Sequence, residues 1–463
     1  MENIAFIPID NRPVCYSLPE QIADINENVK LLLPPRTMLG DLKKTADING
    51  LLKWIETQKQ VDKIVLSLDT IAHGGLIPSR RSKDTFEEIE NRINLLKSIL
   101  KRKNVQVFAF SSIMRISNNN VNEEEKEYWN LYGEKIFKYS YEFHKNSSTD
   151  SNIPEDILKD YLKTRNRNFE INKLYLEWAK QGFFNTLVFS KDDCAQYGLN
   201  VKEAQELQEL IDKNGLNALI KTGADEIPLS LLSRAVIGEK EIKIAPVFTE
   251  PDYVNKISKY EDVSVYDSVK GQIELAGAKI APENAADIVL LINNFKEEQG
   301  ELVMGVDVEG FKGQICFPEK PFIIADIRNA NGADNDLVKE LLEFDLTCEN
   351  FLGYGAWNTT GNTLGSVICC ALFKYLSLKF NKKAFQKVQM IRFLDDWAYQ
   401  ANVRKEMKNE SVGIDAKILK DKMKNFESLI KEKFSCNFAE ISYKFPWDRL
   451  FEIEVLINVN KTM

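Results

Sequence analysis

The feature that most constrains the fold is a repeated alternation of short hydrophobic runs with longer amphipathic stretches. The runs are continuous, as is typical of strands buried on both faces of a parallel sheet. The stretches between them have helical spacing, most clearly at Phe86–Lys101, Val201–Lys213, Leu337–Phe344 and Thr363–Lys379. This order predicts βαβ units and a mostly parallel sheet. The predicted strands are Ile4–Ile9, Leu31–Leu33, Lys63–Leu68, Val105–Ser111, Thr186–Ser190, Ala218–Thr222, Ile242–Phe248, Val263–Tyr266, Asp287–Ile292, Phe322–Ile327 and Phe351–Tyr354.

Eight or more such units fit a barrel, a doubly wound sheet or two α/β lobes. We expect an α/β protein with a (β/α)₈-like barrel of the TIM type over residues 1–380, because polar residues follow many of the strands. A polar segment at about 117–168 is expected to be a helical insertion. Residues 381–463 carry no parallel-strand signal and are expected to form a mostly helical extension that ends in a hairpin.

Composition excludes several classes of function. The formal charge of −8 argues against nucleic-acid binding, which requires a basic face. The seven cysteines form no C-x-x-C motif, which favours reduced thiols and a cytoplasmic location. With two histidines a three-histidine zinc site is excluded. No run approaches the roughly 18 apolar residues that a membrane span needs, and the first residues do not form a signal peptide. No cofactor is expected, and a homo-oligomer stays open.

Polar residues gather where the predicted strands end, which is where ligands bind in parallel α/β proteins. Four of the fourteen arginines, at positions 12, 80, 115 and 328, lie just after predicted strands. Such residues predict a site for a small polar ligand, although each alone could also be a turn residue or a helix cap. The predicted binding residues are Asp10, Arg12, Asp69, His73, Gly74, Arg80, Asp225, Asp326, Asn331, Asp334, Tyr354, Trp357, Asn358 and Asn362.

Several long motifs are similar to those of a known bacterial family. The resemblance begins at Ile7-Pro-Ile-Asp-Asn-Arg-Pro-Val14 and continues at Ser67–Asp69 and His73–Arg80. It returns at Asp326–Asp334 and at Ala356–Gly365. Together these segments resemble DUF4127, a domain-of-unknown-function family, over nearly the whole chain. The resemblance implies no reaction, so the function has to be argued from the site.

The strongest catalytic candidate is the pair Asp192-Asp193, which follows the predicted strand Thr186–Ser190. Adjacent carboxyl groups can divide into a general acid and an ionised group that orients the substrate. The pair resembles that of TIM-barrel N-acetylhexosaminidases, which use the substrate's acetamido group. By that analogy Asp192 polarises the acetamido group and Asp193 is the acid. Residues on later strands would bind hydroxyls (Asp326, Asn331 and Asn358) or form an apolar wall for the sugar ring (Tyr354 and Trp357). An exposed turn is the alternative interpretation.

The sequence therefore predicts a glycoside hydrolase-like enzyme for a small polar carbohydrate. One alternative is a metal-dependent lyase or hydrolase in which carboxylates converge on Mg²⁺ or Mn²⁺, the candidates being Asp10, Asp69, Asp192, Asp193 and Asp326. Another alternative is a sugar-binding protein without catalysis. Neither a nucleic acid nor a membrane is an expected partner.

Overall fold

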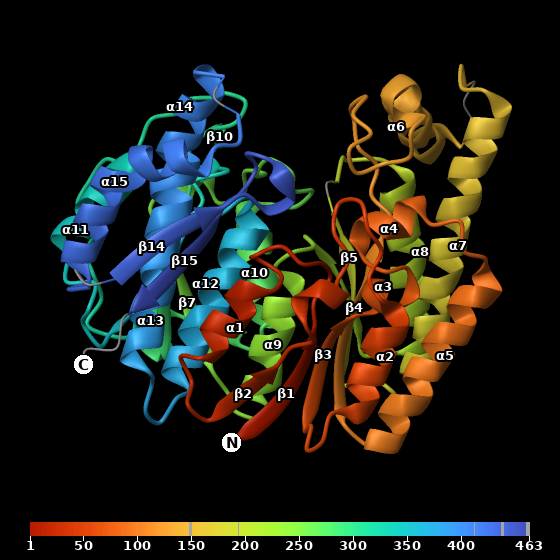
Figure 1. The fold of residues 1–463 in the computed structure, drawn as a ribbon, viewed down its shortest axis with the longest axis horizontal. Helices are drawn as coiled ribbons and strands as arrows, with labels where there is room; N and C mark the ends of the chain where they lie inside the picture. Colours follow the sequence, from red (N-terminus) through yellow and green to blue (C-terminus); the bar gives the residue numbers. More distant parts are fainter. Residues whose placement is uncertain (148–150, 193, 412, 437–438, 460–463) are drawn as a thin grey trace. The chain divides into compact units, whose positions relative to one another are not determined.

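The computed structural model describes residues 1–147, 151–192, 194–411, 413–436 and 439–459. The chain divides into two compact units. Unit 1 consists of Met1–Tyr16, Lys30–Ala235 and Tyr260–Asp262. Unit 2 consists of Ser17–Val29, Val236–Lys259 and Val263–Met463. Each unit contains a parallel sheet of its own (Figure 1).

The sheet of unit 1 has six strands in the order β2-β1-β3-β4-β5-β6. The pairings β1–β3, β3–β4, β4–β5 and β5–β6 are all parallel. Successive side chains of a strand point to opposite faces of the sheet. Phe6 and Ile7 of β1 are both buried, so both faces of the sheet are covered at this strand. The strands are β1 (Glu2–Ile7), β2 (Val29–Leu32), β3 (Lys63–Ser67), β4 (Gln106–Ile113), β5 (Thr186–Lys191) and β6 (Ala218–Thr222).

Helices of unit 1 share one hydrophobic core with a face of this sheet. Buried residues of α2, α3, α5, α7 and α8 pack with Ala5, Ile64, Val107 and Leu187 of the strands. A second, smaller core lies beneath α6 and contains Trp129. The helices are α2 (Ile48–Thr57), α3 (Leu68–Ala72), α4 (Leu76–Arg81), α5 (Phe86–Lys103), α6 (Trp129–Asn146), α7 (Glu155–Lys180), α8 (Leu199–Asn214) and the short 3₁₀ helix Arg36–Met38, while α9 (Ile227–Ile237) spans the boundary with unit 2.

The sheet of unit 2 has five strands in the order β13-β11-β9-β7-β8, and every neighbouring pair is parallel. Two small sheets accompany it: a parallel pair, β10–β12, and an antiparallel pair, β14–β15. The strands are β7 (Lys243–Phe248), β8 (Lys279–Ile280), β9 (Ile288–Asn293), β10 (Gly300–Glu301), β11 (Phe322–Asp326), β12 (Asn329–Ala330), β13 (Phe351–Gly355), β14 (Ala439–Lys444) and β15 (Glu454–Val459).

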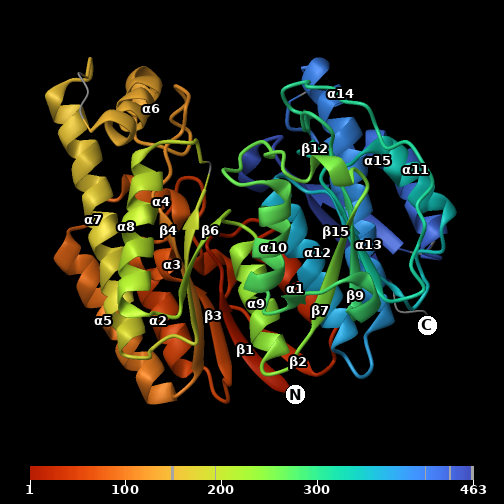
Figure 2. The same ribbon diagram turned by 180° about the vertical axis from the view of Figure 1, so that it is seen from behind.

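Unit 2 is covered on both faces of its five-stranded sheet. Helices α10 (Val265–Leu275) and α12 (Thr360–Tyr375) bury their apolar sides with β7, β9 and β11 (Figure 2). Aromatic rings line the other face, where Phe351 of β13 meets Phe385 of α13 (Lys382–Arg392). The remaining helices are α1 (Ser17–Ala23), α11 (Asn335–Glu343), the π-helix η4 (Phe393–Val403), α14 (Arg404–Asn409), α15 (Ala416–Lys433) and the 3₁₀ helices Pro251–Tyr253, Glu283–Ala285 and Pro446–Asp448. Of the helices in the described part, none is both long enough and apolar enough to cross a membrane.

Both sheets have the same strand order. With the strands numbered in chain order within each sheet, both run 2-1-3-4-5, and the sheet of unit 1 adds a sixth strand at the end. This is the doubly wound, flavodoxin-like order, in which the chain reverses direction beside its first strand. The reversal lies between β1 and β3 in unit 1 and between β7 and β9 in unit 2. Loops at the carboxyl ends of these strands are where such sheets bind ligands.

The predicted (β/α)₈ barrel is therefore wrong, since the described strands form two separate open sheets. The alternation of strand and helix is the same in a barrel and in a doubly wound sheet. What separates them is the order in which strands pair, and the hydrophobic pattern does not encode it. The predicted strand Val263–Tyr266 is also wrong, because Ser264 caps α10 by accepting a hydrogen bond from the Asp267 amide.

Helix α5 illustrates how local signals position an element against the core. Thr85 and Glu88 form a capping box at its start, and Asn104 ends it in the left-handed conformation. Of two consecutive leucines in this helix, Leu96 is fully buried and Leu95 is 49% exposed. Two leucines that are adjacent in the sequence therefore lie in opposite environments.

We predict that Leu96→Ala lowers the free energy of unfolding by about 2–5 kcal/mol, since it removes core contacts and leaves a cavity. Leu95→Ala is the matched control and should change it by less than about 0.5 kcal/mol. Urea unfolding followed by intrinsic tryptophan fluorescence, to which Trp178 of the same core contributes, measures both. Equal effects of the two variants would contradict the placement of α5.

Candidate functional site

The loop after β1 is tied to the loop after β6 by Arg12. Its Nε donates to Asp10 at 2.9 Å, and Nη1 and Nη2 donate to the two carboxylate oxygens of Asp225 at 3.0 and 2.5 Å. The Arg12 amide also donates to Asp10 at 2.9 Å. All three side chains are buried. Three residues predicted from the sequence thus meet in one ion-pair network.

Cys15 joins this network, and its sulfur and the carboxylates of Asp10 and Asp225 lie within 4.8 Å of one another. Such a set could in principle ligate a cation. However, Nη2 of Arg12 lies 2.8 Å from Asp10, 2.5 Å from Asp225 and 3.8 Å from the Cys15 sulfur. The guanidinium supplies the positive charge that the carboxylates need, so the group fits an arginine rather than a metal.

Asp69 connects the ends of the neighbouring strands β3 and β4. It lies in α3, directly after β3, and its carboxyl group accepts a hydrogen bond from the Ser112 amide at 2.8 Å. The side chain is buried, and burial raises its pKa to about 7. A buried carboxyl group that stays protonated to near neutral pH therefore lies beside the β1–β3 reversal.

His73 and Gly74 follow α3 and shape the backbone. His73 is buried, and burial together with the charges of Arg167 and Arg92 holds its pKa well below the usual range. Gly74 has a φ of +87°, and a Cβ there would lie 2.9 Å from the Thr45 side chain. Glycine is therefore required at this position, and the neutral histidine is a packed side chain.

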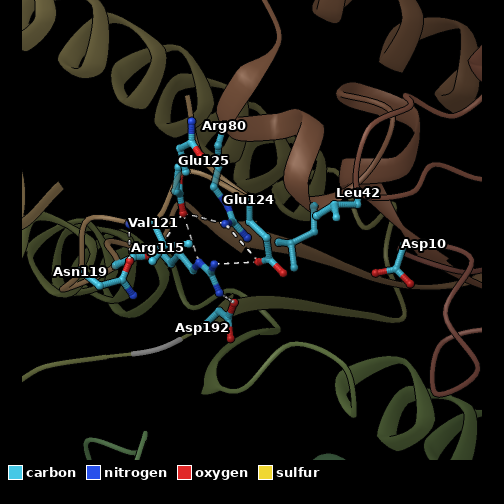
Figure 3. Close-up of polar contacts among 12 residues, drawn as sticks. Asp10, Leu42, Arg80, Arg115, Asn119, Val121, Glu124, Glu125 and Asp192 are labelled. Carbon is cyan, nitrogen blue, oxygen red and sulfur yellow. Dashed lines mark hydrogen bonds and ion pairs between the residues drawn. The ribbon is translucent and has the colours of Figure 1, made fainter. Parts of the chain in front are cut away.

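Two arginines and three carboxylates form a cluster at the same edge of unit 1 (Figure 3). We call it the Arg80–Arg115 cluster. Arg80 of α4 donates to Glu125 at 2.8 Å. Arg115, which follows β4, contacts Glu124 at 2.7 Å and lies 3.4 Å from both Glu125 and Asp192. Glu124 and Glu125 belong to the polar excursion between β4 and α6, and Asp192 follows β5.

The cluster has a buried side and an open side. The side chains of Arg80 and Glu125 are 1% and 4% exposed, whereas those of Arg115, Glu124 and Asp192 are 15–22% exposed. A solute can therefore approach one side of a charged network that is anchored within the protein. The predicted catalytic residue Asp192 lies on that side, and its predicted partner Asp193 lies outside the described residues.

Glu226 is a candidate that the sequence prediction missed. It follows β6, is fully buried, and its pKa is raised well above the usual value, mainly by burial and in part by the charges of Glu261, Asp225 and Asp192. Its carboxyl group folds back over Gly223, where φ is +108° and a Cβ would lie 1.7 Å from Oε1. The signal that could have found it is the run Gly223-Ala-Asp-Glu226 at a strand end.

In unit 2, Asp326 ends β11 and is surrounded by donors. Its oxygens accept from Asn293 at 2.9 Å, from the Asp334 amide at 2.7 Å and from Tyr354 at 3.3 Å. Burial raises its pKa to about 7, and the charge of Asp334 adds to the effect. Asp334 in turn caps α11 and lies 3.3 Å from Arg328. These groups satisfy one another and hold the loop after β11.

The π-helix supports the same edge of unit 2. Asp396 accepts from the Ala356 amide at 2.8 Å and pairs with Arg392 at 3.0 Å, while its main-chain oxygen accepts from Ala333. Burial raises the pKa of Asp396 to about 7. Asp396 therefore joins the loops that follow β11 and β13.

The other predicted residues of unit 2 are also close together. Asn331 and Asn358 both have positive φ values, of 63° and 59°, and the Asn331 amide donates to the Asn358 carbonyl at 2.8 Å. Trp357 is buried, as is Asn362 in the first turn of α12. Tyr354 and Trp357 contact other aromatic rings, those of Phe393 and Phe451 respectively.

The structure does not gather the five carboxylates of the metal hypothesis among its described residues. Asp10 binds Arg12, Asp69 accepts from Ser112, and Asp192 faces Arg115. Asp326 belongs to unit 2, and Asp193 is outside the described residues. Each described carboxylate of this set thus has a different partner.

We predict that Asp69→Asn makes stability less dependent on pH. Because folding raises the pKa of Asp69 from an ordinary value near 4 to about 7, the folded protein binds this proton more tightly, and stability from this group falls as pH rises between those values. Between pH 4.5 and 7.5, the free energy of unfolding of the variant should therefore rise relative to that of the parent by on the order of a few kcal/mol. Urea unfolding at both pH values measures the difference, with the exposed Asp212→Asn as control. A gain equal to that of the control would contradict the prediction.

The family described as "Protein of unknown function (DUF4127)" matches residues 4–456 of the chain. No curated protein matches the chain. The matched residues span both sheets and every candidate residue described above. The chain therefore belongs to the DUF4127 family.

Proposed function

We propose that this protein is a glycosidase-like hydrolase of a small polar carbohydrate, with its reacting groups at the carboxyl edge of the unit 1 sheet. The observation that carries the proposal is a contrast between two carboxyl groups after the neighbouring strands β5 and β6. Asp192 is partly exposed and lies 3.4 Å from the Arg115 guanidinium. Glu226 is fully buried, and its pKa is raised.

Hydrolysis of a glycosidic bond needs this division of roles. One carboxyl group must keep a proton for the leaving oxygen, and a second, ionised group must stabilise the positive charge that develops on the sugar or orient a participating substituent. Burial favours the neutral form of Glu226, whereas Asp192 is partly exposed and lies beside the Arg115 guanidinium. We therefore assign the acid to Glu226 and the ionised carboxylate to Asp192.

Two earlier predictions remain part of the proposal. Asp193 is the acid according to the hexosaminidase analogy, so it is tested alongside Glu226. A cytoplasmic location is supported by the seven cysteines, none of which forms a disulfide.

A metal-dependent enzyme is the alternative class. Among the described residues, the ligand atoms of Asp10, Cys15 and Asp225 lie near enough to one another to hold a metal ion, but the guanidinium of Arg12 already lies among them. For this reason we favour catalysis by carboxyl groups. Measuring the rate with and without EDTA separates the two classes of enzyme.

The purified chain should hydrolyse at least one chromogenic glycoside in a panel that includes N-acetylhexosaminides, with the same rate in EDTA. Glu226→Gln should lower kcat by about 10²–10⁴-fold, the usual contribution of a general acid. Asp192→Asn should lower it as well, because the neutral amide cannot stabilise positive charge. Glu209→Gln and Asp212→Asn, at exposed positions of α8, are the matched controls.

Each other outcome selects a different function. Loss of turnover in EDTA would show that the reaction depends on a metal. A rate that survives Glu226→Gln but not Asp193→Asn would make Asp193 the acid. Sugar binding without turnover would make the chain a binding protein.

A further inference from the structure

The Arg80–Arg115 cluster has a net negative charge. Glu124, Glu125 and Asp192 contribute three carboxylates, and Arg80 and Arg115 contribute two guanidinium groups. The cluster therefore carries a formal charge of −1 when all five groups are ionised. An additional carboxylate or phosphate would increase the repulsion within it. Despite its two arginines, the cluster is not suited to an anionic group.

One donor of the cluster has no acceptor among the residues that the structure describes. Nη2 of Arg80 is buried and makes no hydrogen bond to any of them, although Nη1 donates to Glu125 at 2.8 Å. The side chain is 1% exposed, and its guanidinium lies among the carboxylates of Glu124 and Glu125 (Figure 3). A buried guanidinium N–H is costly to leave unpaired, so this position calls for an oxygen atom from outside the chain.

The other terminal nitrogen of Arg80 is also separated from a nearby carboxylate oxygen. Nη1 of Arg80 lies 3.8 Å from Oε2 of Glu124, too far for a direct hydrogen bond. One oxygen atom at about 2.8 Å from both groups could accept from the arginine and donate to the glutamate. Only a hydroxyl group or water does both, because carboxylate and phosphate oxygens lack the hydrogen. Arg115 and Asp192, 3.4 Å apart, offer a second loosely joined donor and acceptor.

We propose that the Arg80–Arg115 cluster is the subsite for the hydroxyl groups of the substrate, and that it selects a neutral sugar over an acidic or phosphorylated one. The inference rests on the proposed function and names the substrate class of that site. The ligand enters at the open side, where Arg115, Glu124 and Asp192 are partly exposed. Glu124 determines specificity, since its carboxylate accepts a hydrogen bond from a hydroxyl group but repels an anionic group of a ligand.

The test is a binding measurement, so that it does not depend on turnover. Isothermal titration calorimetry of the full chain uses four probes: glucose, N-acetylglucosamine, glucuronate and glucose 6-phosphate. At least one neutral sugar should bind ten-fold or more tightly than both anionic probes. Glu124→Gln should weaken the neutral sugar by about ten-fold or more, since it removes a hydrogen bond to a charged acceptor. It should also reduce the preference over glucuronate, because the cluster charge changes from −1 to zero.

Glu123→Gln is the matched control, because it makes the same change one residue away at an exposed position. Arg115→Lys is a second variant that keeps the charge but loses the planar fork, so it should weaken the sugar without reducing the preference over glucuronate. Circular dichroism checks that each variant is folded.

The outcomes separate this inference from the proposed function. Binding of a neutral sugar with these variant effects, but without hydrolysis of any glycoside, would support the subsite and refute the enzyme. Glucuronate or glucose 6-phosphate binding as tightly as the neutral sugars would overturn the inference. So would equal effects of Glu124→Gln and Glu123→Gln, or the absence of binding of all four probes.

Discussion

The ion pairs of Arg12 fix the carboxyl edge of unit 1. The residue lies after the first strand of its sheet, and one of its partners, Asp225, lies after the sixth. Removing one member of a buried ion pair leaves an uncompensated charge and typically costs about 3–5 kcal/mol. The loop after β6 is therefore held in one conformation. Since Glu226 follows Asp225 directly, the same constraint positions the buried carboxyl group to which we assign the acid.

Two sheets with the same strand order place their direction reversals at equivalent points, yet the two edges differ in how exposed their charged groups are. In unit 2, Asp326 accepts from Asn293, Asp334 and Tyr354, and the loop after β11 is fixed by this network. In unit 1, the side chains of Glu124 and Asp192 are each 22% exposed, whereas Asp326 and Asp334 of unit 2 are buried. A buried network stabilises loops, whereas charged groups that solvent can reach are able to bind a ligand. This contrast is why the function is assigned to unit 1.

The positions of most strands follow from the sequence, because each depends on a local run of buried residues. The run Thr186–Ser190 predicts β5 to within one residue of Thr186–Lys191. The sheet itself is not predictable in this way. Strand β7 pairs with β8 and β9, and β11 lies between β9 and β13. Such pairings join distant parts of the chain, and a barrel would use the same local pattern. The error at Val263–Tyr266 has a different cause, since a Ser264 cap outweighs a short β-branched run.

The candidate site was predictable where its residues directly follow strands, as Asp10, Arg12 and Asp225 do. Glu124 and Glu125 were not, because they reach Arg80 only when a polar excursion folds back across about 45 residues of sequence. Asp225 and Glu226 show the further limit. They are adjacent acidic residues, and burial raises the pKa of both, but the Arg12 guanidinium opposes this rise at Asp225. The chemical role of a carboxyl group thus depends on tertiary neighbours that no local motif specifies, and this applies equally to the charge balance around Arg80 and Arg115.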